Sequence, residues 1–285
     1  MIDMGKEITV IGVGQMGTGI AQAALQAGYS VMLIDKNQEF LNKGFARLTE
    51  NLGKAVEKGK ITADDKTRLL ANVRLAQNMD GIGKSDFVIE AVPEIFDLKM
   101  EIFRNADEFC GSGAILATNT SSILINKLAA AVSDPSRFIG LHFFNPANVM
   151  KLVEVVVGTK TSQATLSASL GFISSLGKTP VKVNDAPGFI SNRILMAFIN
   201  EAISDLQKGI AEKEAIDSIA KLGFNHPMGP IELADFIGLD VCKDIMDFIY
   251  LETKDEKFKP AQILVKLVQE GKLGRKSGEG FYKYK

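Results

Sequence analysis

His142 and Glu154 have the residue types and the spacing of a general base and the carboxylate that orients it. Glu154 lies in the middle of Leu152–Val157, an otherwise apolar segment typical of a strand, where a carboxylate is costly to bury without a partner. A bend over residues 145–148 would fold this segment back on the one that ends near His142, twelve positions earlier. The carboxylate would then hold one imidazole nitrogen and fix the tautomer, while the other nitrogen accepts a proton. Spacing alone leaves an alternative, in which His142 is a hydrogen-bonded core residue and Glu154 lies exposed on an edge strand.

A glycine-rich turn near the start of the chain has the pattern GxGxxG of a dinucleotide-binding loop. It lies between a short apolar segment, typical of a buried strand, and a segment of helical composition. In such a loop the first glycine permits the tight turn, the second lets the backbone approach a pyrophosphate, and the third lets helix and strand pack closely. The N–H groups at the start of the helix then bind the phosphates. The predicted NAD loop comprises Gly12, Val13, Gly14, Gln15, Met16 and Gly17.

Asp35 supports the nucleotide interpretation. It follows the predicted second strand, residues 30–34, and lies 18 positions after Gly17, near the spacing of about 20 expected for a carboxylate that hydrogen-bonds the ribose hydroxyls. A carboxylate there would repel a 2′-phosphate, so NAD is favoured over NADP, although the neighbouring Lys36 softens that preference. The alternative is a structural strand–helix–strand unit that binds no nucleotide.

The elements around these residues predict an α/β fold with a Rossmann-type, doubly wound and mostly parallel sheet. Apolar segments alternate with helical ones from residue 8 to residue 183, and in such sheets ligands bind beyond the carboxyl ends of the strands. Residues 90–94 and 118–122 fall at that edge. Ser121 and Ser122 would ordinarily cap the next helix, predicted over residues 123–131, and this role is compatible with a catalytic one.

The second part of the sequence predicts an all-α domain. Apolar residues recur at helical spacing over residues 190–206, and three further helices are expected over residues 211–222, 231–250 and 260–270. The predicted domains are residues 1–184, which bind NAD, and residues 185–285, which contribute to the substrate cleft and to dimerisation. The broad apolar face of the first helix would serve as internal core, as a homodimer surface, or as both. Asn192 falls in the first turn of that helix, where its side chain could point into the cleft between the domains.

The composition excludes several classes of protein. The chain has 285 residues, with 33 Lys and Arg against 34 Asp and Glu, a formal charge of −1. This balance gives no basic field for nucleic acid or an anionic membrane. Two cysteines without a CxxC pair, together with His142 and His226, offer no metal site, and His226 is interpreted as a structural loop residue. The first residues lack the pattern of an export signal and no apolar run is long enough to cross a bilayer, so we expect a cytoplasmic protein.

Taken together, the motifs resemble those of the 3-hydroxyacyl-CoA dehydrogenase family, and within it the short bacterial members that act on 3-hydroxybutyryl-CoA. The resemblance runs over essentially the whole chain. It rests on VIGVGQMGTGIA, IEAVPE, ATNTSS, GLHFFNPANVMKLVEVV, DAPGFISNRIL, NHPMGPIELADFIGLD and GRKSGEGFYKYK. The HFFNP and PGF-x-x-NR blocks are far more specific than the glycine motif.

The resemblance implies an oxidoreductase that interconverts L-3-hydroxybutyryl-CoA and acetoacetyl-CoA by hydride transfer to or from NAD, in fatty acid or butanoate metabolism. It implies His142 as the general base paired with Glu154, and Ser121 and Asn192 as contacts of the substrate oxygen. NAD contacts are implied for the glycine motif and for Asp35, Glu94, Lys99, Ser121, Asn145 and Lys276. Coenzyme A contacts are implied for Lys58 and Asn51, although family members often carry Ser at the second position.

Two rival functions remain open at this point. A β-hydroxyacid dehydrogenase that acts on small acids shares the Rossmann-plus-helices plan but uses a catalytic lysine near the domain junction, where this chain has Asn192. A dinucleotide-binding sensor that has lost the chemistry is the non-enzymatic alternative, and the joint presence of His142, Glu154, Ser121 and Asn192 argues against it. The absence of a GxSxG motif argues against a serine hydrolase.

Overall fold

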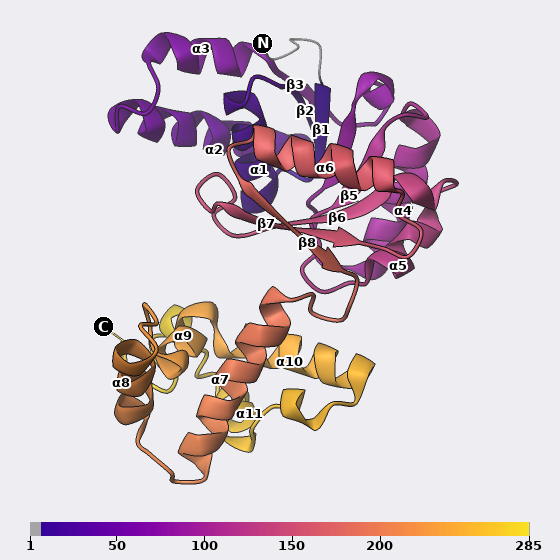
Figure 1. The fold of residues 1–285 in the computed structure, drawn as a ribbon. Helices are drawn as coiled ribbons and strands as arrows, with labels where there is room; N and C mark the ends of the chain where they lie inside the picture. Colours follow the sequence, from indigo (N-terminus) through magenta and orange to yellow (C-terminus); the bar gives the residue numbers. More distant parts are fainter. Residues whose placement is uncertain (1–6, 285) are drawn as a thin grey trace. The chain divides into compact units, whose positions relative to one another are not determined.

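The computed structural model describes residues 7–284 (Figure 1). The chain divides into two compact units, the first ending at Asp185 and the second beginning at Ala186. Residues 1–6 lie outside the described residues. The prediction that the chain lacks an export signal depends in part on them.

The first unit is built on a mostly parallel sheet. Within the described residues the sheet has eight strands in the order β3-β2-β1-β4-β5-β6-β7-β8. Every neighbouring pair is parallel except β6 and β7, which are antiparallel. The predicted Rossmann-type, doubly wound fold is therefore confirmed. The strands are β1 (Glu7–Ile11), β2 (Ser30–Ile34), β3 (Val73–Ala76), β4 (Phe87–Glu90), β5 (Ile115–Thr118), β6 (Phe138–Phe143), β7 (Leu152–Val157) and β8 (Thr179–Asn184).

Helices cover both faces of this sheet. Successive strand residues point to opposite faces, and in the central strands β4, β5 and β6 every residue is buried, so both faces need a cover. Ile139 belongs to the apolar core shared with α1 and α6, whereas the adjacent Phe138 packs edge-on against Phe103 of α4, with ring centroids 4.7 Å apart. The predicted helix over residues 123–131 is shorter than expected, since α5 is followed by a 3₁₀ turn. The helices are α1 (Gln15–Gln26), α2 (Gln38–Glu57), α3 (Ala63–Ala71), α4 (Phe96–Phe109), α5 (Ile125–Leu128) and α6 (Gln163–Ser175).

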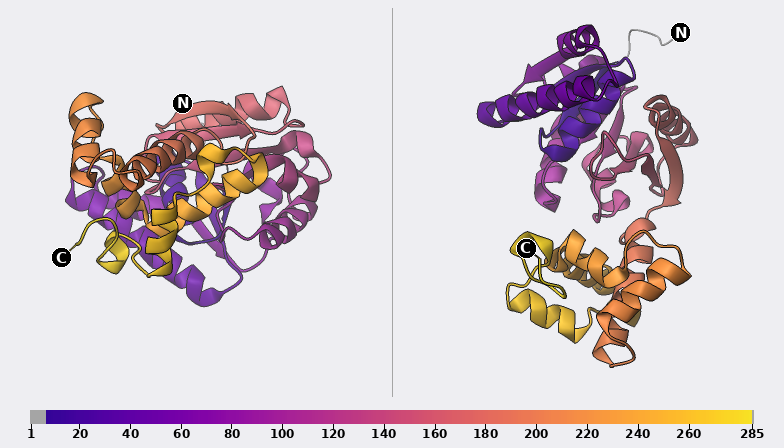
Figure 2. Two further views of the ribbon diagram at one scale, coloured as in Figure 1. Left: turned by 90° about the horizontal axis from the view of Figure 1, so that it is seen from below. Right: turned by 90° about the vertical axis from the view of Figure 1, so that its left-hand side faces the viewer.

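The second unit is all-α, as predicted, and its helices are seen from two further sides in Figure 2. Its core is a separate apolar cluster that includes Met196, Ile231 and Met246. The single helix predicted over residues 231–250 is wrong: the chain turns at Gly238, whose φ of 109° strains any residue with a Cβ. The helices are α7 (Ser191–Gln207), α8 (Lys213–Gly223), α9 (Pro230–Ile237), α10 (Leu239–Thr253) and α11 (Gln262–Gln269).

Two buried aspartates attach the C-terminal segment to the helices of the second unit. Asp217 Oδ2 accepts a hydrogen bond from the Tyr282 hydroxyl (2.8 Å), and Asp235 accepts from the backbone N–H groups of Phe281 and Tyr282 (3.0 and 2.8 Å). Burial raises the pKa of Asp235 despite these donors. No helix within residues 7–284 has the length and apolar character needed to cross a membrane.

Candidate active site

The antiparallel pairing of β6 with β7 brings His142 and Glu154 together. The two residues lie directly opposite each other in the register, and His142 Nδ1 lies 2.8 Å from Glu154 Oε2. An ionised carboxylate only accepts hydrogen bonds, so it selects the tautomer with the proton on Nδ1 and makes Nε2 the basic nitrogen. The histidine is 8% exposed and the glutamate 2%. The predicted fold-back is therefore confirmed. The alternative of an exposed glutamate on an edge strand is wrong, because β8 covers the other side of β7.

The glycine motif forms a backbone surface at the start of α1. Gly12 has a φ of +97°, and a Cβ on Gly17 would collide with the Gly12 carbonyl oxygen. A Cβ on Gly14, in contrast, would meet nothing within 4 Å. Gly14 is the N-cap of α1, no side chain caps the helix, and its first turn carries no acidic residue. The first N–H groups of α1 therefore face an open space that suits an anion.

Asp35 immediately follows β2 at the same edge of the sheet. It is half-buried, and its Oδ1 accepts a hydrogen bond from the backbone N–H of Asn37 at 3.1 Å. Asn37 in turn caps α2 through its own side chain, which accepts from the N–H groups of Glu39 and Phe40. The carboxylate is therefore held at the end of the strand by a local turn, in the position from which a Rossmann fold contacts a ribose.

A buried ionic network lies beneath the end of β4. Glu90 is fully buried and Lys99 of α4 is 1% exposed. The Lys99 ammonium lies 2.6 Å from Glu90 Oε1 and 3.2 Å from Glu94 Oε2. Thr118 of β5 donates to the second oxygen of Glu90 at 2.7 Å, and the Val92 N–H donates to the first. The network therefore ties β4, β5 and α4 together at the edge where the ligand of such a sheet binds.

Glu94 connects this network to the segment that carries Ser121. Its Oε1 accepts hydrogen bonds from the hydroxyls of Thr120 and Ser122 and from the backbone N–H groups of Ser121 and Ser122. Burial alone would raise the pKa of Glu94, but the Lys99 ammonium and the two hydroxyls lower it below its usual value. The carboxylate is thus kept ionised and fixes the backbone on both sides of Ser121.

The serines do not cap the next helix, so that part of the sequence interpretation is wrong. The N-cap of α5 is Leu124, which supplies no side-chain hydrogen bond. The first N–H groups of the helix, on Ile125 and Asn126, instead donate to the Asp185 carboxylate at 3.0 and 2.8 Å. Asp185 is distant in sequence, and no local pattern indicated its role.

The remaining predicted site residues lie in both units. Asn145 follows β6, and its Oδ1 accepts a hydrogen bond from Gln15 Nε2 at 2.9 Å. Asn51 is half-buried on α2, and Lys58 is the exposed C-cap residue of that helix. Two others belong to the second unit: Asn192 is the second residue of α7, and Lys276 pairs with Asp240 at 2.6 Å.

Sequence reasoning placed Glu90 at this edge but assigned it no role, and it missed Arg47. Glu90 could have been recognised as an acid in a strand that is otherwise apolar, the same signal that singled out Glu154. Arg47 could have been recognised from its position: it lies four residues before Asn51 on α2, so the two side chains share one face of the helix. Within residues 7–284 no group of three or more potential metal-ligating side chains is found.

These features define a class of protein. The open backbone surface at Gly14, the carboxylate at Asp35 and the polar edge formed by Glu94 and Ser121 fit a dinucleotide, and the His142–Glu154 pair provides a base beside it. A Rossmann unit with this equipment is typical of an NAD-dependent dehydrogenase.

Comparison with known protein families confirms this class and specifies it. Residues 7–186 match the NAD-binding domain of 3-hydroxyacyl-CoA dehydrogenase, and residues 188–284 match the C-terminal domain of the same enzyme. The chain therefore belongs to the 3-hydroxyacyl-CoA dehydrogenase family. The predicted family, enzyme class and cofactor NAD are confirmed.

Individual relatives agree over the full length. A probable 3-hydroxybutyryl-CoA dehydrogenase of Deinococcus radiodurans is 49% identical over 96% of this chain and 99% of its own. Another from Bacillus subtilis is 47% identical over 98% and 97%. Among solved structures, the (S)-3-hydroxybutyryl-CoA dehydrogenase of Ralstonia eutropha superposes with a TM-score of 0.96 at 44% identity, covering 98% of this chain and 99% of that one.

Proposed function

We propose that this protein interconverts L-3-hydroxybutyryl-CoA, or a similarly short 3-hydroxyacyl-CoA, and the corresponding 3-ketoacyl-CoA. The observation that carries the proposal is the buried His142–Glu154 pair, 2.8 Å apart, in a unit built to bind NAD. The names of the relatives support the choice of substrate. Three relatives that match almost the whole chain are named 3-hydroxybutyryl-CoA dehydrogenase, two of them as probable members of that class.

In the proposed oxidation, His142 Nε2 takes the proton of the substrate 3-hydroxyl. Bound NAD would supply the hydride acceptor, so that loss of the proton to His142 and of the hydride from C3 leaves the C3–O bond as a ketone. Glu154 stabilises the imidazolium that forms, because its carboxylate is buried against Nδ1. In the reverse direction the imidazolium returns the proton to the oxygen. The electrons and the proton balance without any further reactant.

The other site residues have proposed roles in binding. Ser121 and Asn192 position the substrate oxygen for the transfer. Lys58 and Asn51 contact coenzyme A. The proposed NAD contacts are the glycine motif, Asp35, Glu94, Lys99, Ser121, Asn145 and Lys276. A homodimer formed through the second unit, a cytoplasmic location, and a place in fatty acid or butanoate metabolism stay predictions.

The test replaces each of the two histidines in turn. In His142→Gln we expect the kcat for acetoacetyl-CoA reduction by NADH to fall by about 10²–10⁴-fold, the usual contribution of a general base, while the affinity for NADH is unchanged. The matched control is His226→Gln, because the His226 ring is held by the Met228 carbonyl oxygen in a turn of the second unit (2.6 Å). Turnover by His142→Gln at the rate of the control would remove His142 from the mechanism.

A comparison of substrates tests the rival function. A 3-hydroxyacyl-CoA dehydrogenase should oxidise 3-hydroxybutyryl-CoA and leave the 3-hydroxybutyrate anion almost untouched. The opposite preference would indicate a β-hydroxyacid dehydrogenase.

A further inference from the structure

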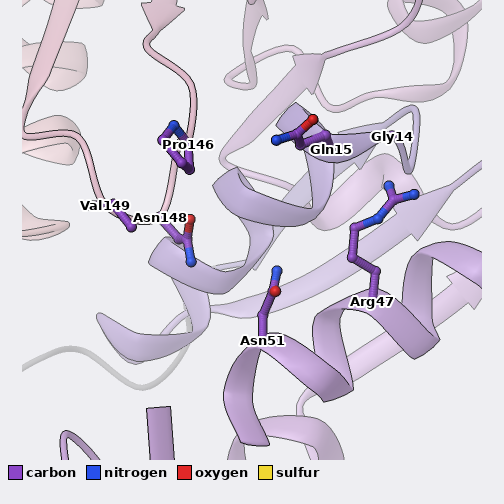
Figure 3. Close-up of a pocket in the computed structure, with 7 residues that line it drawn as sticks. All are labelled: Gly14, Gln15, Arg47, Asn51, Pro146, Asn148 and Val149. Carbon is purple, nitrogen blue, oxygen red and sulfur yellow. The ribbon is translucent and has the colours of Figure 1, made fainter. Parts of the chain in front are cut away.

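A pocket in the first unit adjoins the glycine motif and has a basic side chain that none of the roles above employs. Its volume is about 530 Å³. Figure 3 shows Arg47 and Asn51 extending from α2 toward the start of α1, with the loop after β6 on the facing side. The lining residues are Gly14, Gln15, Arg47, Asn51, Pro146, Asn148 and Val149, and none of them is acidic.

The packing of α2 fixes the position of Arg47. Gly44 is buried against Val13, and a Cβ at that position would lie 2.5 Å from the Val13 Cβ. The helix therefore approaches the glycine loop closely at this point. Arg47 lies almost one turn further along α2 and Asn51 another turn on, so both side chains leave the helix on the side that faces the loop.

The guanidinium of Arg47 has no partner that would occupy it. Within residues 7–284 it makes no hydrogen bond and no ion pair, unlike Arg68, Arg74 and Arg137, each of which pairs with a carboxylate. Glu50 is the acid on α2 that interacts electrostatically with Arg47, but its ion pair is with Lys54 at 2.6 Å. A cation with its donors directed at a pocket that lacks acids is suited to an anionic ligand.

The start of α1 adds donors to the pocket, and the loop after β6 forms the facing wall. The start of α1, at Gly14 and Gln15, presents N–H groups that no side chain caps. Across the pocket, Asn148 is held in place by a hydrogen bond from its Nδ2 to Gln22 Oε1 at 2.9 Å. Helix N-termini and arginine side chains both favour phosphate, and here they line one cavity.

We propose that this pocket binds a phosphate group of a nucleotide ligand and that Arg47 is the side chain that recognises it. The inference rests on the proposed function, since the two ligands of that reaction, NAD and the coenzyme A thioester, both carry phosphates. Arg47 is then a determinant of ligand affinity and takes no part in the chemistry at C3.

The experiment compares Arg47→Gln with the wild type in three titrations: NADH, acetoacetyl-CoA and acetoacetyl-pantetheine, which lacks the nucleotide and its diphosphate. Loss of one charge-assisted contact at an exposed site should raise the KM of the recognised ligand about tenfold and leave kcat unchanged. If the phosphate belongs to coenzyme A, the KM rises for acetoacetyl-CoA only. If it belongs to NAD, the KM for NADH rises with either thioester.

Matched variants separate this effect from a general loss of charge. Arg104→Gln removes the same group from an exposed position on α4 and should behave as the wild type. Arg47→Lys, which keeps the charge without the planar fork, should recover part of the affinity. Raising the ionic strength should weaken binding more in the wild type than in Arg47→Gln.

Equilibrium binding of coenzyme A and of NADH, measured by calorimetry, keeps this test independent of turnover. A wild type that binds both ligands but does not reduce acetoacetyl-CoA would refute the proposed function, while a weaker ligand affinity in Arg47→Gln would still support the phosphate site. Unchanged affinity for both nucleotides in Arg47→Gln would overturn the inference.

Discussion

At the scale of single residues, each buried polar group of the site is stabilised by a partner that is buried with it. His142 and Glu154 occupy two antiparallel strands that are otherwise apolar, and each is almost inaccessible to solvent. Burying either group alone would be costly, so their mutual hydrogen bond is what allows both to remain in the sheet. The same reasoning applies to Glu90 and Lys99, whose ion pair is buried on both sides. Buried polar pairs at the carboxyl edge of the sheet therefore mark the functional region.

Asp35 is expected to decide the choice between NADH and NADPH. In Asp35→Ser the carboxylate that would repel a 2′-phosphate is gone, while the hydroxyl can still accept the hydrogen bond from the Asn37 N–H. We expect the ratio of kcat/KM for NADH to that for NADPH to fall about tenfold or more, the effect of one like-charge contact near the surface. Steady-state rates with each cofactor at fixed acetoacetyl-CoA measure it. Asp64→Ser, an exposed acid at the start of α3, is the control, and a ratio equal to that of the control would contradict the assignment.

At the scale of elements, the start of α1 has two glycines with opposite requirements. Gly17 permits close packing, since its Cβ position is occupied by the carbonyl oxygen of Gly12. Gly14 has open space before it, so what it provides is access for a ligand. One motif therefore serves both the fold and the cofactor, and the two contributions can be separated by the same substitution at each position.

Gly14→Ala and Gly17→Ala form such a pair. Gly17→Ala should reduce the free energy of unfolding by about 2 kcal/mol, because the added methyl forces the helix away from the loop. Gly14→Ala should unfold like the wild type yet raise the KM for NADH about tenfold or more, since the methyl enters the space where the phosphates approach the backbone. Urea denaturation and NADH titration of both variants measure the two effects. Equal stability of the two variants would show that the packing argument at Gly17 fails.

The sequence predicted most elements of the sheet because their signals are local. The strands over residues 30–34 and 152–157 agree with the structure to the residue, since each is a short run of mostly apolar residues. The helix α6 was not predicted, because its small polar residues dilute the apolar pattern that marks a helix. The turn at Gly238 was missed since the apolar spacing continues through it, and only the φ of 109° shows the interruption.

The features of the site that the sequence did not predict are contacts between residues distant in sequence. The pairing of His142 with Glu154 was predictable, because only a short bend separates the two strands. The attachment of Ser121 and Ser122 to Glu94 was not, since it depends on two strand ends becoming neighbours in the sheet. The binding of the α5 N-terminus by Asp185 likewise joins residues that are sixty positions apart.

At the scale of the whole molecule, the stability contributed by different carboxylates changes in opposite directions as the pH falls. Burial raises the pKa of Asp185 and Asp235 above the ordinary value, so the stability linked to these groups is greatest when they are protonated and is lost as the pH rises through their folded-state pKa. Asp107 responds in the opposite sense: burial would raise its pKa, but hydrogen bonds from Ser133 and the charge of Arg137 lower it. The net response to acid is therefore a difference between groups, and single variants are needed to separate it.

Glu94→Gln should isolate one of these contributions. The pKa of Glu94 is lower in the folded protein than the ordinary value of 4.5, so its carboxylate stabilises the fold above pH 4.5, and this stabilisation is lost as the pH falls through the lower folded-state value. The free energy of unfolding of the wild type should therefore exceed that of Glu94→Gln most at pH 6, and the difference should shrink as the pH is lowered past 4.5. Urea denaturation without cofactor at a series of pH values measures this, with Glu101→Gln, an exposed carboxylate on the same helix as Lys99, as the control. A difference that stays constant from pH 6 to pH 3 would mean that Glu94 contributes through packing and hydrogen bonding alone, and that its charge does not stabilise the segment that carries Ser121.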